Sequence, residues 1–316
     1  MSAMTFPARV HIQEVVTRDG LQIEPRFLPT ADKIALIDAL SQTGVSKIEV
    51  TSFVSPKAVP NLADAREVAL GIARRPGVTY VALVPNLRGA EAALAAHMDE
   101  LNLVLSVSET HNLANMRMTP EQSLEGFRAI VAAASGTPAR LNGSLATAFG
   151  CPFEGVQAQD RVLALAERYL ELGLHSVTLA DTTGMANPRQ VAGLVAAFRA
   201  RFGEVPLTLH FHNTRGMGLA NVLAALEEGA DRFDASLGGL GGCPFAPGAT
   251  GNISTEDLVH MLDEMGVPTG VDLARLIELA RGLPALLGHD IPGQVAKAGR
   301  SGDLHPLPAS LRRAAG

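Results

Sequence analysis

The sequence predicts an α/β fold, a (β/α)8 TIM barrel with additional C-terminal helices, on two observations. Eight short runs of β-branched and apolar residues recur along the chain at fairly even spacing, which is typical of strands. Ala- and Leu-rich stretches of helical periodicity separate these runs, and several of them end in glycine, as a capped helix does. Eight strand and helix units favour closure into a barrel, although an open doubly wound sheet can show the same alternation.

The expected elements follow one another in short, regular segments. The strands are expected at residues 10–16, 46–52, 78–84, 101–107, 139–145, 175–180, 205–211 and 230–236. The clearest helical stretches between them are residues 31–44, 125–136, 161–173 and 187–203, and two further helices are expected at 255–266 and 272–288. We therefore expect a single domain over residues 1–316, with the barrel at about 8–265 and the added helices and tail at 266–316.

The composition argues against several classes of function. The formal net charge is −6 and no basic block could neutralise several phosphates, so no nucleic-acid partner is expected. The start of the chain lacks a signal-peptide pattern and no apolar run could span a bilayer, which predicts a soluble, cytoplasmic protein without a membrane partner. The two cysteines, Cys151 and Cys243, cannot build a disulfide framework. No GxGxxG or Walker A segment follows the first strand, which disfavours nucleotide binding.

Reactive side chains gather where the expected strands end. In a TIM barrel the active site lies at the C-terminal ends of the strands, so residues of catalytic type at these positions are the candidates for chemistry. They occur at or after the first, second, sixth, seventh and eighth strands: Arg18, Asp19, Glu49, Asp181, His210, His212, Cys243 and Asn252.

His210 and His212 are the strongest local signal for a metal site. Residues two apart on a strand point to the same side, so both imidazoles are expected to face the barrel mouth. Asp19 would add a carboxylate oxygen from the opposite side of the barrel, and Asn252 an amide oxygen. Two nitrogens and two oxygens suit a divalent ion, Mg²⁺ or Mn²⁺, better than they suit zinc. Taken alone, Asp19 could instead cap a helix and Asn252 could be a turn residue.

The segment from Gly238 to Asn252 has six glycines around Cys243. Such a loop has few side chains to hold it, so it could close over a bound substrate and bring the thiol in. The alternative is a flexible connector with an incidental cysteine. Cys151 has a similar local sequence without the glycine run, and we interpret it as structural.

Seven segments together resemble one known family. They are RDGLQ (18–22), IEVTSFVSPKAVP (48–60), GCPFEG (150–155), DTTG (181–184), HFHNTRG (210–216), LANVLAALEEG (219–229) and GLGGCPFAPGATGNISTEDLVHML (239–262). Over residues 10–271 the chain is similar to the 3-hydroxy-3-methylglutaryl-CoA lyase family, within the wider group of metal-dependent aldolase and Claisen-type TIM barrels. The cysteine-bearing loop separates these lyases from the related synthases.

The resemblance implies a function and a set of ligands. It implies a lyase that cleaves an acyl-CoA, 3-hydroxy-3-methylglutaryl-CoA, to acetyl-CoA and acetoacetate, and an assembly as a homodimer or larger homo-oligomer. The implied ligands of the divalent metal are Asp19, His210, His212 and Asn252.

The resemblance also implies roles for the remaining candidates. Arg18 matches an arginine that steadies the developing enolate, and Asp181 matches the proposed base for the tertiary hydroxyl, with His210 as a possible relay. Cys243 matches a cysteine required for catalysis and Glu49 an acidic active-site residue. For substrate contact we expect Arg18, Gln22 and His111, the last from a loop after the fourth strand.

Two departures leave the metal affinity and the acyl group open. Asn213 stands where many relatives have Asp after the second histidine, which removes a charge beside the metal ligands. The fifth expected strand also differs from the relatives, and its inward side chains could line the acyl pocket. The alternatives are a lyase for a related 3-substituted 3-hydroxyglutaryl-CoA and a condensing synthase of the isopropylmalate or homocitrate type. A barrel retained only for binding is a third, which the intact candidate set disfavours.

Overall fold

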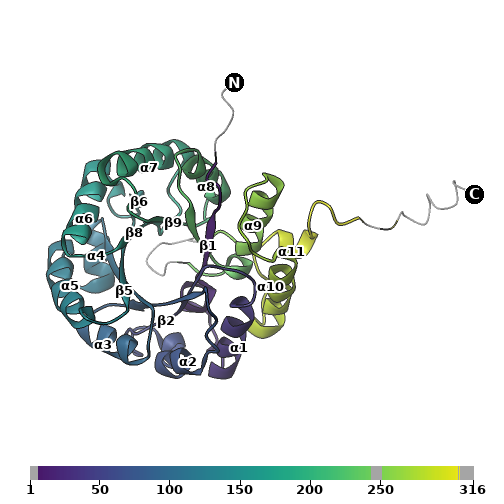
Figure 1. Ribbon diagram of the computed structural model, residues 1–316, viewed down its shortest axis with the longest axis horizontal. Helices are drawn as coiled ribbons and strands as arrows, with labels where there is room; N and C mark the ends of the chain where they lie inside the picture. The colour runs from purple at the N-terminus through teal and green to yellow at the C-terminus, as the bar shows by residue number, and fades with distance from the viewer. Residues whose placement is uncertain (1–5, 243–250, 305, 307–316) are drawn as a thin grey trace, which may run out of the picture.

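The computed structural model describes residues 6–242, 251–304 and 306. Eight parallel strands close into a barrel in the order β1-β10-β9-β8-β5-β4-β3-β2 (Figure 1). Pairing of β1 with β2 closes the sheet, so the barrel is confirmed and the open sheet is not. The strands are β1 His11–Glu14, β2 Lys47–Ser52, β3 Thr79–Val84, β4 Glu100–Ser106, β5 Arg140–Ala146, β8 Ser176–Asp181, β9 Leu207–Phe211 and β10 Arg232–Ala235.

Helices form the outer ring seen in Figure 1. Several begin where a side chain accepts a hydrogen bond from the first turn, as Asn187 does for α7 and Ser254 for α9, and Thr119 and Gln122 form a reciprocal capping box on α5. The helices are α1 Thr30–Leu40, α2 Ala65–Gly71, α3 Leu87–Ala95, α4 Glu109–Met116, α5 Pro120–Ala134, α6 Gln159–Glu171, α7 Pro188–Phe202, α8 Gly218–Glu227 and α9 Thr255–Glu264.

The added C-terminal helices lie on one side of the barrel. Helices α10 Leu273–Leu287 and α11 Val295–Ala298 pack against α9, and α10 also contacts α1 (Figure 1). Helix α10 further contacts η3, a short 3-10 turn at Leu237–Gly239 that follows β10. The extension therefore supports the start of the glycine-rich segment.

The barrel interior is polar, whereas the interiors of TIM barrels are usually filled by branched apolar residues. Gln13 Nε2 donates to Thr208 Oγ1 at 3.0 Å, and Asn142 Nδ2 donates to Thr178 Oγ1 at 3.0 Å. The alternate residues on the strands, such as Ile12, are buried and apolar and belong to the core between strands and helices. The barrel thus has an apolar outer layer and a polar centre.

Three local features differ from the expectation. The first strand ends at Glu14, and a π-helix, η1 Val16–Gly20, replaces the expected end of the strand. A small antiparallel hairpin of β6 Gly150–Cys151 and β7 Gly155–Val156 holds the GCPFEG sequence. His111 lies in helix α4 and not in a loop, because Ser108 caps that helix immediately after β4.

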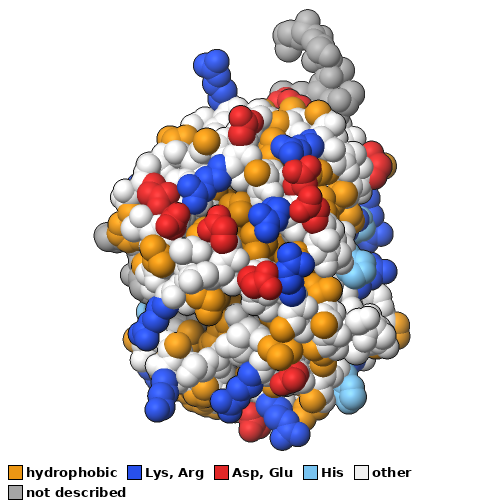
Figure 2. All heavy atoms as spheres, turned by 90° about the vertical axis from the view of Figure 1, so that its left-hand side faces the viewer, with side chains coloured by type: hydrophobic (Ala, Val, Ile, Leu, Met, Phe, Trp, Pro, Cys, Tyr) orange, Lys and Arg blue, Asp and Glu red, His pale blue; other side chains and the backbone are white. Residues whose placement is uncertain are grey.

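On the face shown in Figure 2, acidic and basic side chains are interspersed among apolar ones. This face therefore carries no continuous stripe of one charge of the kind that follows a phosphate backbone. Among the described residues, no helix combines the length and the apolar composition that a membrane span requires.

Candidate functional site

The π-helix after β1 carries Arg18 and Asp19 at the barrel mouth. The backbone N–H groups of Asp19 and Gly20 both donate to the carbonyl of Val15, at 2.8 and 3.3 Å. This wide turn is rare and is found mostly at functional sites. Arg18 and Asp19 contact each other there, and each has a further partner, Glu49 for Arg18 and Asn252 for Asp19.

Asp19, His210 and His212 converge at the mouth. Their ligand atoms all lie within 4.8 Å of one another, and all three side chains are buried. Asp19 Oδ2 is 3.9 Å from Nε2 of His210 and 3.7 Å from Nε2 of His212, and the two Nε2 atoms are 3.1 Å apart. The expectation that Asp19 approaches from the opposite side is wrong, because only β10 separates β1 from β9 in the closed sheet.

This cluster has the geometry and the chemistry of a cation site. Adjacent ligands of a six-coordinate ion at about 2.1 Å lie roughly 3 Å apart, close to the separations of 3.1 to 3.9 Å between these atoms. A carboxylate oxygen and imidazole nitrogens present lone pairs to the same point. The guanidinium of Arg18 donates from Nη1 to Asp19 Oδ1 at 2.6 Å. Burial alone would raise the pKa of Asp19, but the charge of Arg18 and hydrogen bonding with His212 hold it well below its usual range.

Asn252 joins the cluster from the far end of the glycine-rich segment. Its Nδ2 donates to Asp19 Oδ2 at 2.7 Å and to the Leu240 carbonyl at 3.0 Å. Its backbone pairs with His212 in an isolated antiparallel bridge. Within the described part of the chain, the buried Oδ1 of Asn252 has no hydrogen-bond partner. An unpartnered amide oxygen on a residue that already contacts Asp19 fits a site that needs one more oxygen ligand.

Asp234 orients His210 and was not predicted. Its Oδ2 is 3.1 Å from Nδ1 of His210, and the two residues are direct neighbours in the pairing of β10 with β9. Since a carboxylate only accepts, Nδ1 of His210 carries the proton and Nε2 is the free ligand atom of the neutral ring. Burial would lower the pKa of His210, but the hydrogen bond and charge of Asp234 raise it on balance. The sequence did offer one signal. Polar Arg232 and Asp234 alternate with apolar residues on the eighth strand, a pattern that places both on the same side of the sheet.

Arg18 is fixed by a second carboxylate. Its Nε donates to Glu49 Oε2 at 2.5 Å, and Asn102 Nδ2 donates to Glu49 Oε1 at 2.8 Å. Burial raises the pKa of Glu49, although the charge of Arg18 opposes the shift. Among the described residues, Nη2 of Arg18 has no hydrogen-bond partner. The guanidinium is therefore held in one orientation with donor capacity left over.

A pocket of about 620 Å³ opens beside these groups. Arg18, Asp19, His210, His212 and Gln22 line it, and Gln22 Nε2 also donates to Asp19 Oδ1 at 3.0 Å. His111 is buried and lines it too, with Nδ1 2.7 Å from Ser106 Oγ. One wall is apolar and comes from the end of β3 and the segments after β2 and β3: Val54, Ala58, Val59, Pro60, Leu83 and Pro85.

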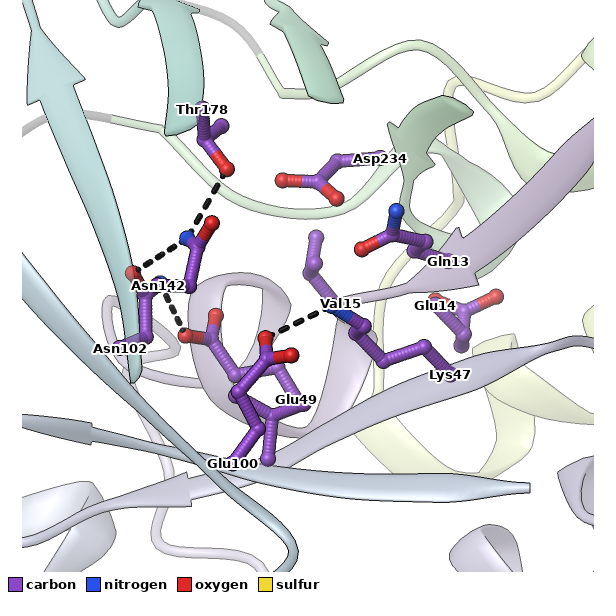
Figure 3. A pocket seen from close by; sticks show the side chains of 11 residues that line it. Gln13, Glu14, Val15, Lys47, Glu49, Glu100, Asn102, Asn142, Thr178 and Asp234 are labelled. Carbon is purple, nitrogen blue, oxygen red and sulfur yellow. Dashed lines mark hydrogen bonds and ion pairs between the residues drawn. The ribbon is translucent and has the colours of Figure 1, made fainter. Parts of the chain in front are cut away.

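Polar side chains meet in the barrel centre (Figure 3). Asn102, Glu49 and Asn142 are linked in a hydrogen-bonded row that ends at Thr178. They line a small cavity of about 20 Å³, large enough for one water molecule. Asn102 and Thr178 line both spaces, so this network is the floor of the larger pocket.

Asp181 is not one of the three residues that converge at the mouth. Asp181 ends β8 and is buried, and its Oδ1 accepts from the backbone N–H groups of Met185 and Ala186 at 2.8 and 3.1 Å. Its Oδ2 has no partner within the described residues, and burial raises its pKa. The next residue, Thr182, lines the pocket, whereas Asp181 is not among the lining residues. Cys243 lies outside the described residues.

Glu14 connects the elements that carry the cluster and was also missed. Its Oε1 accepts from the backbone N–H of Val16 and of Leu237, both at 2.9 Å, and its Oε2 accepts from Thr255 Oγ1 at 2.7 Å. Burial raises its pKa to about 7. One carboxyl group thus joins the π-helix to the residues before and after the glycine-rich segment. A charged residue inside an apolar strand run was the available signal.

Comparison with known proteins gives a consistent result. A profile of the HMGL-like family matches residues 9–282. The chain is 45% identical to hydroxymethylglutaryl-CoA lyase of Bacillus subtilis, over 92% of this chain and 97% of that one, and 44% identical to (R)-citramalyl-CoA lyase of Chloroflexus aurantiacus, over 92% and 95%. The structure of an HMG-CoA lyase from Acinetobacter baumannii in complex with coenzyme A and 3-methylmalate matches with a TM-score of 0.94 and 60% identity, covering 96% of this chain and 99% of that one.

We predict that Asp234→Asn weakens binding of a divalent ion by about 10- to 100-fold, the usual effect of losing the partner of a histidine ligand. Titration of the metal-free protein with Mn²⁺, followed by calorimetry, measures it. Asp231→Asn is the matched control, because Asp231 lies beside the same strand and makes only partly exposed contacts with Arg199 and Arg232. An Asp234→Asn variant that binds Mn²⁺ as tightly as the control would contradict the orienting role.

Proposed function

Because the chain belongs to the HMGL-like family, we propose that it is a metal-dependent carbon–carbon lyase that cleaves 3-hydroxy-3-methylglutaryl-CoA to acetyl-CoA and acetoacetate. The observation that carries the proposal is the convergence of Asp19, His210 and His212 on the wall of a 620 Å³ pocket, next to the fixed guanidinium of Arg18. The relatives named above support the acyl-CoA class of substrate.

Asp19, His210, His212 and Asn252 would hold the divalent ion. The oxygen and imidazole ligands favour Mg²⁺ or Mn²⁺ over ions that prefer thiolate. When bound, the ion would act as a Lewis acid toward the substrate oxygens and favour ionisation of the 3-hydroxyl. The unpartnered Oδ1 of Asn252 supports the inclusion of that residue.

Arg18 would stabilise the charge that develops in the reaction. Cleavage of the bond between C2 and C3 leaves an electron pair on the thioester fragment as an enolate. A guanidinium held by Glu49 and Asp19 cannot swing away, so it stabilises that charge without reorganising when it forms. The donor capacity left at Nη2 supports this role.

The protons balance within the active site. The 3-hydroxyl loses one proton as its oxygen becomes the ketone of acetoacetate, and C2 of the enolate gains one proton to give acetyl-CoA. Asp181, with its unpartnered Oδ2, is our candidate for the base, and His210 is the candidate relay. We propose Cys243 as the donor to C2. No oxidant, reductant or further substrate is needed.

The relatives differ in the acyl group of their substrates, because one of them is named for (R)-citramalyl-CoA, the thioester of a different acid. The floor formed by Asn102, Ser144 and Thr178 is polar and hydrogen-bonded. A polar floor suits the terminal carboxylate of a short acid better than it suits a long apolar substituent. This favours 3-hydroxy-3-methylglutaryl-CoA over analogues with extended chains.

We predict that the purified protein releases acetyl-CoA from 3-hydroxy-3-methylglutaryl-CoA, that chelation of the metal stops the release, and that Mg²⁺ or Mn²⁺ restores it. A panel that includes citramalyl-CoA and 3-hydroxyglutaryl esters with longer substituents, assayed for acetyl-CoA, tests the substrate. Faster cleavage of citramalyl-CoA would move the assignment to that acid. Silence with every ester, with or without metal, would contradict the proposal.

We also predict that Arg18→Gln lowers kcat by about 100- to 1000-fold, the cost of losing one donor to a developing oxyanion. Arg74→Gln, which removes a half-exposed surface arginine paired with Asp99, is the control and should retain full activity. Steady-state kinetics with circular dichroism separates loss of catalysis from loss of fold. A folded Arg18→Gln variant with a kcat near that of the control would remove Arg18 from the mechanism.

A further inference from the structure

The two ends of the glycine-rich segment cross in backbone contact beside the metal cluster. A Cβ atom placed on Gly251 would lie 1.7 Å from the carbonyl oxygen of Gly239 and 2.8 Å from its carbonyl carbon. No side chain can occupy that space without separating the two stretches of backbone. The Gly251 carbonyl accepts from the backbone N–H of Asn213 at 3.0 Å, so this crossing is also tied to the residue after His212.

Gly241 packs against the ligands themselves. A Cβ there would lie 2.6 Å from Asn252 Nδ2, and 3.2 Å from both the carbonyl oxygen and Oδ2 of Asp19. Gly241 also has a φ of +110°, a conformation that disfavours any side chain. Its bare Cα atom therefore leaves room for the hydrogen bond of 2.7 Å between Asn252 and Asp19.

We propose that Gly241 and Gly251 are positioning residues of the metal centre, whose missing side chains let Asn252 reach Asp19 and pair with the backbone of His212. The inference rests on the proposed metal site and adds a role for backbone that touches the ligands. It differs from the interpretation that the glycines serve only to make the loop flexible. Flexibility alone would leave the affinity for the ion unchanged when one methyl group is added.

Two other glycines of the segment, Gly238 and Gly239, have different neighbours from Gly241. A Cβ on Gly238 would meet Leu283 and Ile291 in the C-terminal region, and one on Gly239 would lie 3.1 Å from Pro292 and 3.4 Å from the carbonyl oxygen of Asn252. The backbone N–H of Gly293 donates to the Gly238 carbonyl at 2.9 Å. Gly238 fits the segment against the extension and Gly239 fits it against both Pro292 and the Asn252 backbone, whereas Gly241 packs against the side chains of Asn252 and Asp19, and Gly251 lets the two ends of the segment meet.

The test is the affinity of metal-free protein for Mn²⁺, measured by the electron paramagnetic resonance signal of the free ion. Gly241→Ala and Gly251→Ala are each expected to bind Mn²⁺ at least about tenfold more weakly than the wild type, as when outer contacts of metal ligands are lost. Matched controls are Gly266→Ala, which has a φ of +70° and open space, and Gly282→Ala, which lies within helix α10 in open space. Both controls should bind within about twofold of the wild type.

A double substitution shows whether the effect passes through Asn252. In an Asn252→Ala background the closest clash of Gly241→Ala disappears, so the added loss of affinity should fall well below that seen in the wild type. If Gly251→Ala does not fold, as judged by circular dichroism, Gly241→Ala carries the test, because its clash is with a side chain that can shift. A folded Gly241→Ala that binds Mn²⁺ as the wild type does would overturn the inference. Absence of Mn²⁺ binding by the wild type would instead overturn the metal centre.

Discussion

One buried carboxylate in contact with opposite charge organises the whole site. Asp19 lies among Arg18, Gln22 and Asn252 and faces two imidazole nitrogens 3.7 and 3.9 Å away. A buried carboxylate with only the histidines beside it would tend to take up a proton, because burial disfavours its charge. Arg18 keeps it ionised, so the cluster can attract a cation at neutral pH. The same guanidinium is held by Glu49. Arg18 therefore contributes both to the charge of the proposed metal site and to the proposed enolate site.

The closed barrel makes this arrangement possible because it brings the first strand back beside the last strand, β10. With β10 alone between β1 and β9, the π-helix after β1 reaches the histidines of β9 across a single strand. The intervening strand then contributes Asp234 to His210, and the segment that follows it returns Asn252. The proposed ligands and Asp234 therefore come from three adjacent strands and the segments that follow them. The pocket extends from them over the other side of the mouth, toward the walls formed by the loops after β2 and β3.

Local patterns predicted the parts of this site that depend on local geometry. The eight strands could be located because apolar runs and helical periods alternate, and His210 with His212 could be paired because a strand repeats every two residues. The position of Asp19 beside these histidines could not be predicted, because it depends on closure of the barrel. The π-helix that carries Asp19 also has no clear sequence signature. Asp234 and Glu14 were missed because a carboxylate on a strand does not reveal its distant partner. The glycines were interpreted as flexible, and only their neighbours show that Gly241 packs against ligand atoms.

We propose that Asp19, His210, His212 and Asn252 share one divalent ion. The most direct measurement is an anomalous-difference map from crystals of the protein grown with Mn²⁺, recorded at the manganese absorption edge. We expect a single strong peak about 2.1 Å from one carboxylate oxygen of Asp19 and from Nε2 of both histidines, with Oδ1 of Asn252 also in contact. An empty cluster in crystals that hold Mn²⁺ elsewhere, or a peak that Asp19 does not reach, would contradict it.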